Sequence, residues 1–340
     1  MKTPLLSIAT LLSAMSVMSV MATTGLAQAQ SNVTVYGVVD AGIVYENNGS
    51  TTVTRMDSGI LNSSRLGFKG TEDLGNGLNA IFLLESGFNV DTGAQSDAAR
   101  LFNRQAFVGL TGAFGAVRMG RQVNPVYANN ATFDPFRIGM AGDSSRLISF
   151  NGSRTDNLLT YSYAANGLRG ELQYGAGEVA GNNSANRTLA GFAGYQAGPV
   201  DVVITHQNIR NATDTNATKM TLIGGNVQID WATLYAAYGW EKGVILGTTS
   251  PLDQRDLLLG ARAKAGEAGT VVFSYIRKTD KAVANADATQ VAIGYIHDLS
   301  KRTALYTSYG QIRNDGAAKY KVLTGGATDK VLNVGVRHYF

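Results

Sequence analysis

Few residues in this chain could act as catalytic bases. It has three His residues, His206, His297 and His338, and His206 lies within ten positions of Asp201 and Asp214. A barrel hydrolase could assemble a site from such residues, but no His-x-x-x-His, Gly-x-Ser-x-Gly or Gly-x-x-x-x-Gly-Lys motif is present. Cys is absent, which excludes a disulfide framework and a cysteine metal site. The sequence therefore predicts neither an enzyme nor a metal or cofactor site.

Charged side chains alternate with apolar ones in the segment 58–72. Leu66 and Phe68 share one face of an extended chain there, whereas Arg65 and Lys69 share the other. This pattern suits a strand with lipid on one side and water on the other. The chemistry it predicts is electrostatic, because charges held around a wet passage sort ions and polar solutes without binding them tightly.

The last eleven residues show the same alternation. One face carries Leu332, Val334, Val336, His338 and Phe340, and the other carries Asn333, Gly335, Arg337 and Tyr339. A soluble enzyme rarely ends in this way, whereas a strand of an outer-membrane β-barrel needs one apolar and one polar or small face. The ending therefore predicts such a barrel.

The N-terminal segment predicts where the barrel goes. Met1-Lys2 precedes a Leu-, Met-, Val- and Ala-rich stretch, residues 5–22, and Ala27-Gln28-Ala29 is a small-x-small cleavage signature. Residues 1–29 are therefore predicted to be a secretory signal peptide that is cleaved before folding. An N-terminal membrane anchor is the alternative, which the Ser residues in the stretch disfavour. Both alternatives predict export.

Composition narrows the class further. Removing the one Lys of residues 1–29 lowers the formal net charge of +4 by one, which is too small to predict binding to nucleic acid. Beyond that segment no stretch approaches the roughly 18 apolar residues of a spanning helix, whereas a spanning strand needs only about 9 to 11. The 40 Gly, 5 Pro and 15 Tyr fit many strands, tight turns and aromatic belts. A soluble exported β-sandwich has a similar composition and remains an alternative.

The rest of the chain divides into sixteen strand-like segments joined alternately by short and long connections. These segments are 32–46, 58–72, 78–90, 100–110, 115–122, 156–165, 168–178, 187–196, 200–210, 218–229, 232–240, 255–264, 270–278, 288–298, 303–314 and 330–340. Short periplasmic turns and longer outer loops are typical of outer-membrane barrels, and an even number lets the first and last strands pair. We therefore predict an all-β fold, a transmembrane 16-stranded antiparallel β-barrel over residues 30–340, with fourteen or eighteen strands as alternatives. About sixteen strands leave a water-filled channel.

One connection, residues 123–155, has no strand period. It is rich in Pro, aromatic and charged residues, including Pro125, Phe133, Pro135 and Phe136. A loop of more than about 15 residues inside a compact architecture is usually functional or disordered. This composition predicts that the loop folds into the barrel and narrows the channel. An ordinary surface loop is the alternative.

Several motifs, in family order over nearly the whole chain after residue 29, resemble Gram-negative general diffusion porins of the beta-proteobacterial type. They are Val33 to Gly42, Ser64 to Leu78, Asn103 to Leu110, Phe114-Gly115, Met119 to Arg121, Leu299 to Thr303 and Gly335 to Phe340. The resemblance implies passive diffusion of ions and small hydrophilic solutes through a homotrimer in outer-membrane lipid. It also implies a third loop folded into each channel, and recognition of the terminal Phe340 by the barrel-assembly machinery.

The resemblance also implies which charges line the constriction, because basic wall residues of such porins face acids on the folded-in loop. The candidates are Arg65, Lys69, Arg104, Arg118, Arg121, Asp134 and Asp143. Arg118 is included because it alternates with Val117 and Met119 and so shares the channel face. Since the basic candidates outnumber the acidic ones, we expect a channel that prefers anions.

Alternation conflicts with two of these residues. It places Arg121 on the lipid face, where a charge at mid-depth costs about 2 to 4 kcal/mol. We therefore expect a β-bulge, or the end of the strand, near Gly120. Alternation also places Arg104 on the lipid face, because it is an even number of positions from Val108 and Leu110. A position at the barrel rim is the alternative for these arginines. An adhesin or phage receptor that uses the long outer loops is a further function, compatible with a channel.

Overall fold

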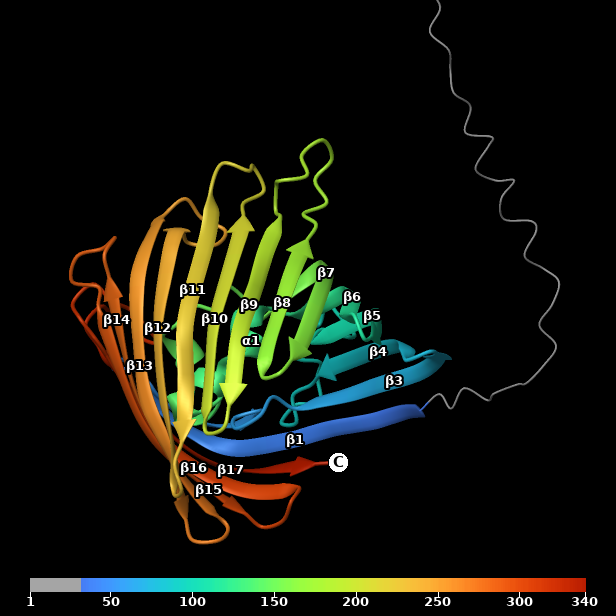
Figure 1. Ribbon diagram of the computed structural model, residues 1–340. Coiled ribbons are helices and arrows are strands. Elements are labelled where there is room, and N and C mark those ends of the chain that lie inside the picture. Colours follow the sequence, from blue (N-terminus) through green and yellow to red (C-terminus); the bar gives the residue numbers. More distant parts are fainter. Residues whose placement is uncertain (1–31) are drawn as a thin grey trace, which may run out of the picture. The chain divides into compact units, whose positions relative to one another are not determined.

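The computed structural model of this chain describes residues 32–340; the expected signal peptide, residues 1–29, lies outside them. Most of the described chain is β-strand, and neighbouring strands are antiparallel (Figure 1). The first strands are β1 (Asn32–Asn47), β2 (Thr52–Ser58), β3 (Arg65–Gly75), β4 (Leu78–Gly87), β5 (Gln105–Gly112), β6 (Gly115–Val123), β7 (Arg154–Ala165) and β8 (Leu168–Gly175). The others are β9 (Thr188–Ala197), β10 (Val200–Arg210), β11 (Ala217–Gln228), β12 (Ala232–Val244), β13 (Pro251–Ala265), β14 (Gly269–Asp280), β15 (Ala288–Asp298), β16 (Thr303–Asn314) and β17 (Thr328–Tyr339).

The first and last strands close the barrel. β1 pairs with β17 from Val38 opposite Tyr339 to Asn47 opposite Lys330. On its other side, β1 pairs with β2 through one half and with β3 through the other. β2 and β3 are therefore one barrel strand, interrupted at residues 59–64, and the prediction of a closed 16-stranded barrel is confirmed.

That interruption corrects two expected boundaries. The segment 47–57, expected to be a loop, contains all of β2 except Ser58, and the expected strand 58–72 is broken by residues 59–64. The connection between β1 and β2 is thus only residues 48–51. At the opposite end the turns are short, as in Asn166-Gly167, where φ angles of 51° and 80° allow a two-residue hairpin turn.

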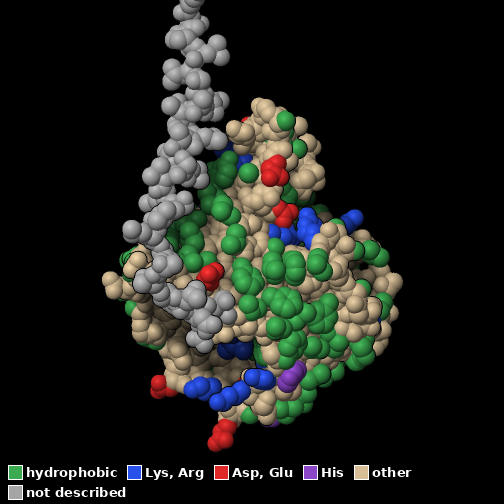
Figure 2. All heavy atoms as spheres, turned by 90° about the vertical axis from the view of Figure 1, so that its right-hand side faces the viewer, with side chains coloured by type: hydrophobic (Ala, Val, Ile, Leu, Met, Phe, Trp, Pro, Cys, Tyr) green, Lys and Arg blue, Asp and Glu red, His purple; other side chains and the backbone are tan. Residues whose placement is uncertain are grey.

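The outer wall of the barrel is apolar and exposed. In β16, Leu305 and Tyr309 are 45% and 42% exposed, whereas Ala304 and Tyr306 on the inner face are buried. Figure 2 shows hydrophobic side chains spread across the middle of the visible face, with Lys and Arg at its lower edge and in a second group towards the upper right. An exposed apolar band of this kind is typical of a barrel whose outer wall faces lipid.

A β-bulge in β6 confirms the expected irregularity near Gly120. The register with β7 shifts between Gly120 and Gln122, and Gly120 has a φ of 130°. A Cβ atom there would lie 2.2 Å from the carbonyl oxygen of Ala106, so only glycine fits. The shift releases Arg121 from the lipid face. Arg104 needs no bulge because β5 begins after it, at Gln105.

The helical segments of the described residues lie in the connection between β6 and β7. They are α1 (Pro125–Ala128), α2 (Asn130–Phe133) and the single-turn 3-10 helices η2 (Met140–Gly142) and η3 (Ser144–Arg146). Among residues 32–340, none of the helices has the length and apolar character needed to cross a membrane.

Candidate functional site: the channel constriction

The connection between β6 and β7, which we call the constriction loop (residues 124–153), begins with a capped helix. The Asn124 side chain accepts a hydrogen bond of 2.8 Å from the Tyr127 amide, and Pro125 occupies the first turn of α1. Asn124 also donates to the carbonyl oxygen of Phe150, which joins the two ends of the loop. The local sequence thus starts the loop as a compact structure.

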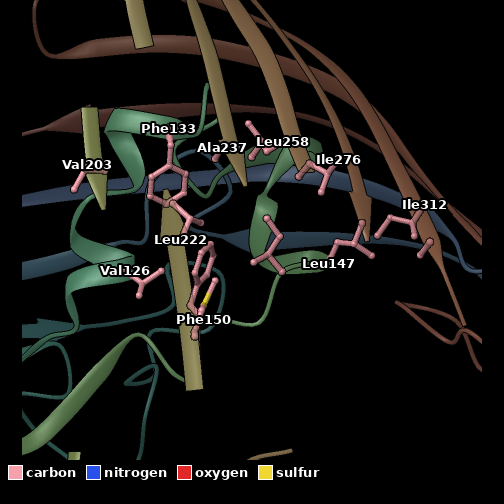
Figure 3. Close-up of a cluster of buried hydrophobic side chains, with 13 residues drawn as sticks. Val126, Phe133, Leu147, Phe150, Val203, Leu222, Ala237, Leu258, Ile276 and Ile312 are labelled. Atoms are coloured by element: carbon pink, nitrogen blue, oxygen red, sulfur yellow. The ribbon is translucent and has the colours of Figure 1, made fainter. Parts of the chain in front are cut away.

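The loop packs against the inner face of the wall and not on the outside, as predicted. Figure 3 shows Val126, Phe133 and Phe150 beside inward side chains of the wall. The wall contributes Val203, Met220, Leu222, Ala237, Leu258, Ile276, Ala288 and Ile312, from β10 to β16. Fully burying a large apolar side chain contributes about 1.5 to 3 kcal/mol. The loop is therefore held on one side of the lumen.

Polar contacts hold the same side of the loop. The Ala141 amide donates to Ser308 Oγ at 2.9 Å, and an Arg262 Nη1 donates to the carbonyl oxygen of Pro135 at 2.6 Å. Arg146 forms ion pairs with Glu46, at 3.2 Å, and with Asp329. These contacts anchor the loop tip to the wall on both sides of the β1/β17 seam.

A buried cluster of charges lies beneath the end of the loop. Lys278 Nζ is 2.8 Å from Glu241 Oε1 and 3.0 Å from Asp256 Oδ1, and all three side chains are almost completely buried. The Ser149 amide of the loop donates to the same Glu241 oxygen at 3.2 Å. Removing one partner of such a buried pair costs about 3 to 5 kcal/mol, because it leaves the other charge buried and unpaired. Lys278 is therefore required wherever Glu241 and Asp256 are present.

Asp134 organises the loop from within. Its carboxylate accepts hydrogen bonds from the amides of Phe136 and Ile138, at 2.8 and 2.9 Å, and from Ser144 Oγ at 2.7 Å. The side chain is fully buried, and burial raises the pKa of Asp134 to about 6. The expectation that Asp134 faces the channel is therefore corrected, because its role here is inside the loop.

A second inward element faces the loop tip. Residues 59–64, which we call the inward bend, leave the sheet between β2 and β3. The buried carboxylate of Asp40 accepts hydrogen bonds of 3.1, 3.0 and 2.8 Å from the amides of Ile60, Leu61 and Asn62. The Tyr306 hydroxyl donates to it as well, at 2.6 Å. Asp40 was missed in the sequence, although an inward carboxylate within an apolar strand was a signal.

The inward bend and the constriction loop touch. The Met140 amide donates to the carbonyl oxygen of Ile60 at 2.6 Å. The passage past this contact is a cavity of about 600 Å³, lined on one side by Gly59, Ile60 and Ser63 and on the other by loop residues that include Asp143 and Arg146. Asp143 is one of the residues that line this cavity. It also caps η3 by accepting a hydrogen bond from the Ser145 amide.

Two of the expected arginines share one carboxylate on the opposite wall. Glu85, which is 5% exposed, pairs with Arg104 at 2.7 Å and with Arg65 at 3.4 Å. The Tyr36 hydroxyl donates to the same carboxylate at 2.9 Å. Glu85 holds both guanidinium groups in place and cancels part of their charge.

Arg121 and Arg154 extend this basic wall. Arg121 pairs with Asp156 and donates to the carbonyl oxygen of Asn103 at 2.8 Å. Arg154 lies over the Tyr127 ring at 5.5 Å, and among residues 32–340 no ion pair includes it. A cavity of about 330 Å³ is lined by Arg104, Arg121 and Arg154 together, and it shares Gly59 and Ser63 with the passage. Arg154 was missed because it stands at the end of a segment without alternation.

Two expected residues lie apart from this group. Lys69 stacks on the Tyr36 ring, with Nζ 5.4 Å from its centroid, four positions along β3 from Arg65 towards the short turn. Arg118 pairs with Glu171 and stacks on Phe107. Both are on inward-facing positions, but the structure gives them partners outside the constriction.

The candidate catalytic residues do not come together. His206 is on the outer wall and shares a hydrogen bond of 2.8 Å with Thr221 Oγ1. Asp201 pairs with Arg169, and Asp214 with Arg210. Within residues 32–340, no group of three or more His, Asp or Glu residues is placed to hold a metal ion.

This geometry agrees with comparisons to known proteins. The family model described as Gram-negative porin matches residues 14–317. Outer membrane porin protein 32 of Delftia acidovorans is 31% identical over 358 residues, which cover 95% of this chain and 98% of that protein. Major outer membrane protein P.IB of Neisseria meningitidis serogroup B is 29% identical over 331 residues, covering 92% and 95%.

Solved structures show the same fold. The anion-selective porin from Comamonas acidovorans superposes with a TM-score of 0.79 at 28% identity, over 92% of this chain and 100% of that one. OmpT of Vibrio cholerae, described in its trimer form, gives 0.71 at 15% identity, over 91% and 99%, and supports the fold alone. The chain belongs to the Gram-negative porin family and is an outer-membrane channel for passive diffusion, not an enzyme.

Proposed function

We propose that this porin prefers anions and that the basic wall formed by Arg65, Arg104, Arg121 and Arg154 sets the preference. The observation that carries the proposal is Arg154, whose charge no carboxylate of the described chain pairs with, in the cavity that it shares with Arg104 and Arg121. A cation in a narrow wet passage attracts anions and repels cations. The anion-selective structural relative from Comamonas acidovorans is consistent with this reading.

Carboxylates beside the loop tip give the field a direction. Asp143 lines the passage, and Glu46 and Asp329 outnumber the arginine that they pair with, Arg146. Basic and acidic groups on different parts of the lining orient dipolar solutes as they pass. Charge preference then comes from the basic wall, and Lys69 and Arg118 contribute to the potential of the wider lumen.

A planar-bilayer recording of the wild-type protein under a salt gradient tests the proposal. With potassium chloride at about 0.1 M on the dilute side, the zero-current potential should have the sign of chloride permeation. At about 1 M the potential should shrink towards zero, because the Debye length falls to about 3 Å. A potential with the sign of potassium permeation at 0.1 M would contradict the proposal.

We further propose that the protein is a homotrimer, exported by cleavage of residues 1–29 and recognised for assembly through Phe340. The Phe340 amide and carbonyl exchange hydrogen bonds of 3.2 and 3.3 Å with Gly37, and its ring occupies the space that a side chain at residue 37 would fill. The terminal residue thus belongs to the seam that closes the barrel. Unheated protein in mild SDS should migrate near three times the monomer mass, and monomer alone would refute the trimer.

A further inference from the structure

Two lysines face each other on the outer wall. Lys219 of β11 is directly opposite Lys242 of β12 in the strand register, and both side chains are exposed. Directly opposite Cβ atoms of an antiparallel pair are about 5 Å apart, and like charges there are destabilising. Neither lysine takes part in an ion pair within the described chain. Asp253, which is opposite Lys242 on the other side, pairs with Arg255. The pair is thus a site of uncompensated positive charge.

The position of the lysines matches the level of lipid headgroups. Each lies two positions from the long-loop end of its strand. On the same face as Lys242, towards the short turns, come Trp240 and then Tyr238, whose rings pack edge to face at 4.8 Å. Aromatic side chains form girdles at the boundary between the apolar band and the headgroups. The lysines therefore stand just outside the apolar band.

An apolar groove lies beside them. It has a volume of about 710 Å³ on the outer face of β7 to β10 and is lined by Leu159, Leu172, Leu189 and Ile204. His206 also lines the groove and hydrogen-bonds to Thr221, which is two residues from Lys219 on the same face of β11. The groove and the lysine pair are thus adjacent parts of one surface.

We propose that this surface binds a phosphorylated membrane lipid, with the phosphate between Lys219 and Lys242 and an acyl chain in the groove. The phosphate neutralises two charges that otherwise repel each other, and the groove buries a chain that a free phosphate lacks. The site faces the membrane and is separate from the channel. A negative result for this lipid site would therefore leave the proposed anion preference unaffected, and the reverse also holds.

The test compares lipids that differ only in the headgroup. Purified protein in detergent is incubated with dioleoyl phosphatidic acid or dioleoyl phosphatidylcholine, and bound lipid is counted by native mass spectrometry. Wild-type protein should retain phosphatidic acid in preference to phosphatidylcholine. Each lysine near a membrane surface strengthens binding to anionic lipid about fivefold, so K219Q/K242Q should bind phosphatidic acid about 25-fold more weakly.

Two matched variants make the outcome decisive. K301Q/R302Q removes the same charge from the exposed short turn at the opposite end and should bind phosphatidic acid like the wild type. L189W fills the groove and should weaken binding of phosphatidic acid while leaving the lysines in place. Unchanged single-channel conductance shows that each variant is folded.

Three results would overturn the proposal. The first is retention of phosphatidic acid by K219Q/K242Q at the wild-type level. The second is equal retention of the two lipids by the wild type, which would show that the charge is irrelevant. The third is full displacement of phosphatidic acid by about 1 mM inorganic phosphate together with no effect of L189W, which would show that the surface takes phosphate alone.

Discussion

Replacing Arg154 by Gln should reduce the anion preference, and more so at low salt than at high salt. Arg154 is the sharpest target because no carboxylate pairs with it in the described chain, so its removal exposes no new negative charge. Arg65 and Arg104 are less suitable, because their replacement leaves Glu85 buried without its partners.

The magnitude follows from Coulomb's law. A unit charge about 5 Å from a passing ion changes its energy by about 0.8 kcal/mol at a dielectric constant of about 80. Screening lowers this to about 0.5 kcal/mol at 0.1 M salt and about 0.2 kcal/mol at 1 M. Anions lose an attraction and cations lose a repulsion, so the permeability ratio should fall about fivefold at 0.1 M and less than twofold at 1 M.

The assay is the zero-current potential of single channels under a salt gradient, measured for wild type, R154Q and K301Q. The last variant removes one charge from an exposed turn outside the lumen and should behave like the wild type. An unchanged potential for R154Q at 0.1 M, or a shift of equal size at 1 M, would show that Arg154 does not act on the permeating ions through a screened field.

Three other outcomes follow from contacts described above. Deleting Phe340 should leave export intact but lower the amount of folded protein at the cell surface, and unchanged surface labelling would count against its role in assembly. Replacing Lys278 by Met leaves Glu241 and Asp256 buried without a cation, so it should lower stability by about 3 to 5 kcal/mol in a denaturant titration; a loss below about 1 kcal/mol would contradict this. The pKa of Asp134 is raised to about 6, so the folded loop binds a proton more tightly than the unfolded chain between about pH 4 and 6. The hydrogen-exchange protection of the loop should therefore fall as pH rises through that range. The variant D134N should lack this pH dependence.

The barrel could be read from the sequence because each strand carries its own signal. Alternation and turn residues are local, and they gave β16 and β17 nearly residue by residue. The break at residues 59–64 had no such signal. It depends on hydrogen bonds to Asp40, some 20 positions away, which only the folded barrel brings together.

The site was less accessible for the same reason. Arg65, Arg104 and Arg121 lie in recognisable motifs, and the bulge at Gly120 followed from the cost of a charge in lipid. The role of Asp134 depended on how the loop folds on itself, and the alternation of apolar and polar residues gives no information on that. Arg154 gained its importance because no carboxylate of the described chain forms an ion pair with it, which is a property of the assembled wall.

The contact between the inward bend and the constriction loop separates two properties of the channel. Met140 and Ile60 are joined by a main-chain hydrogen bond, so the separation of the two segments at this point is set largely by the backbone. The charges that sort ions belong to other segments, chiefly β3 to β7 and the residues just before them. The molecular sieve and the ion filter are therefore encoded in different stretches of the chain. Substitutions can retune the charge filter for a new medium while the size limit on solutes stays as it was.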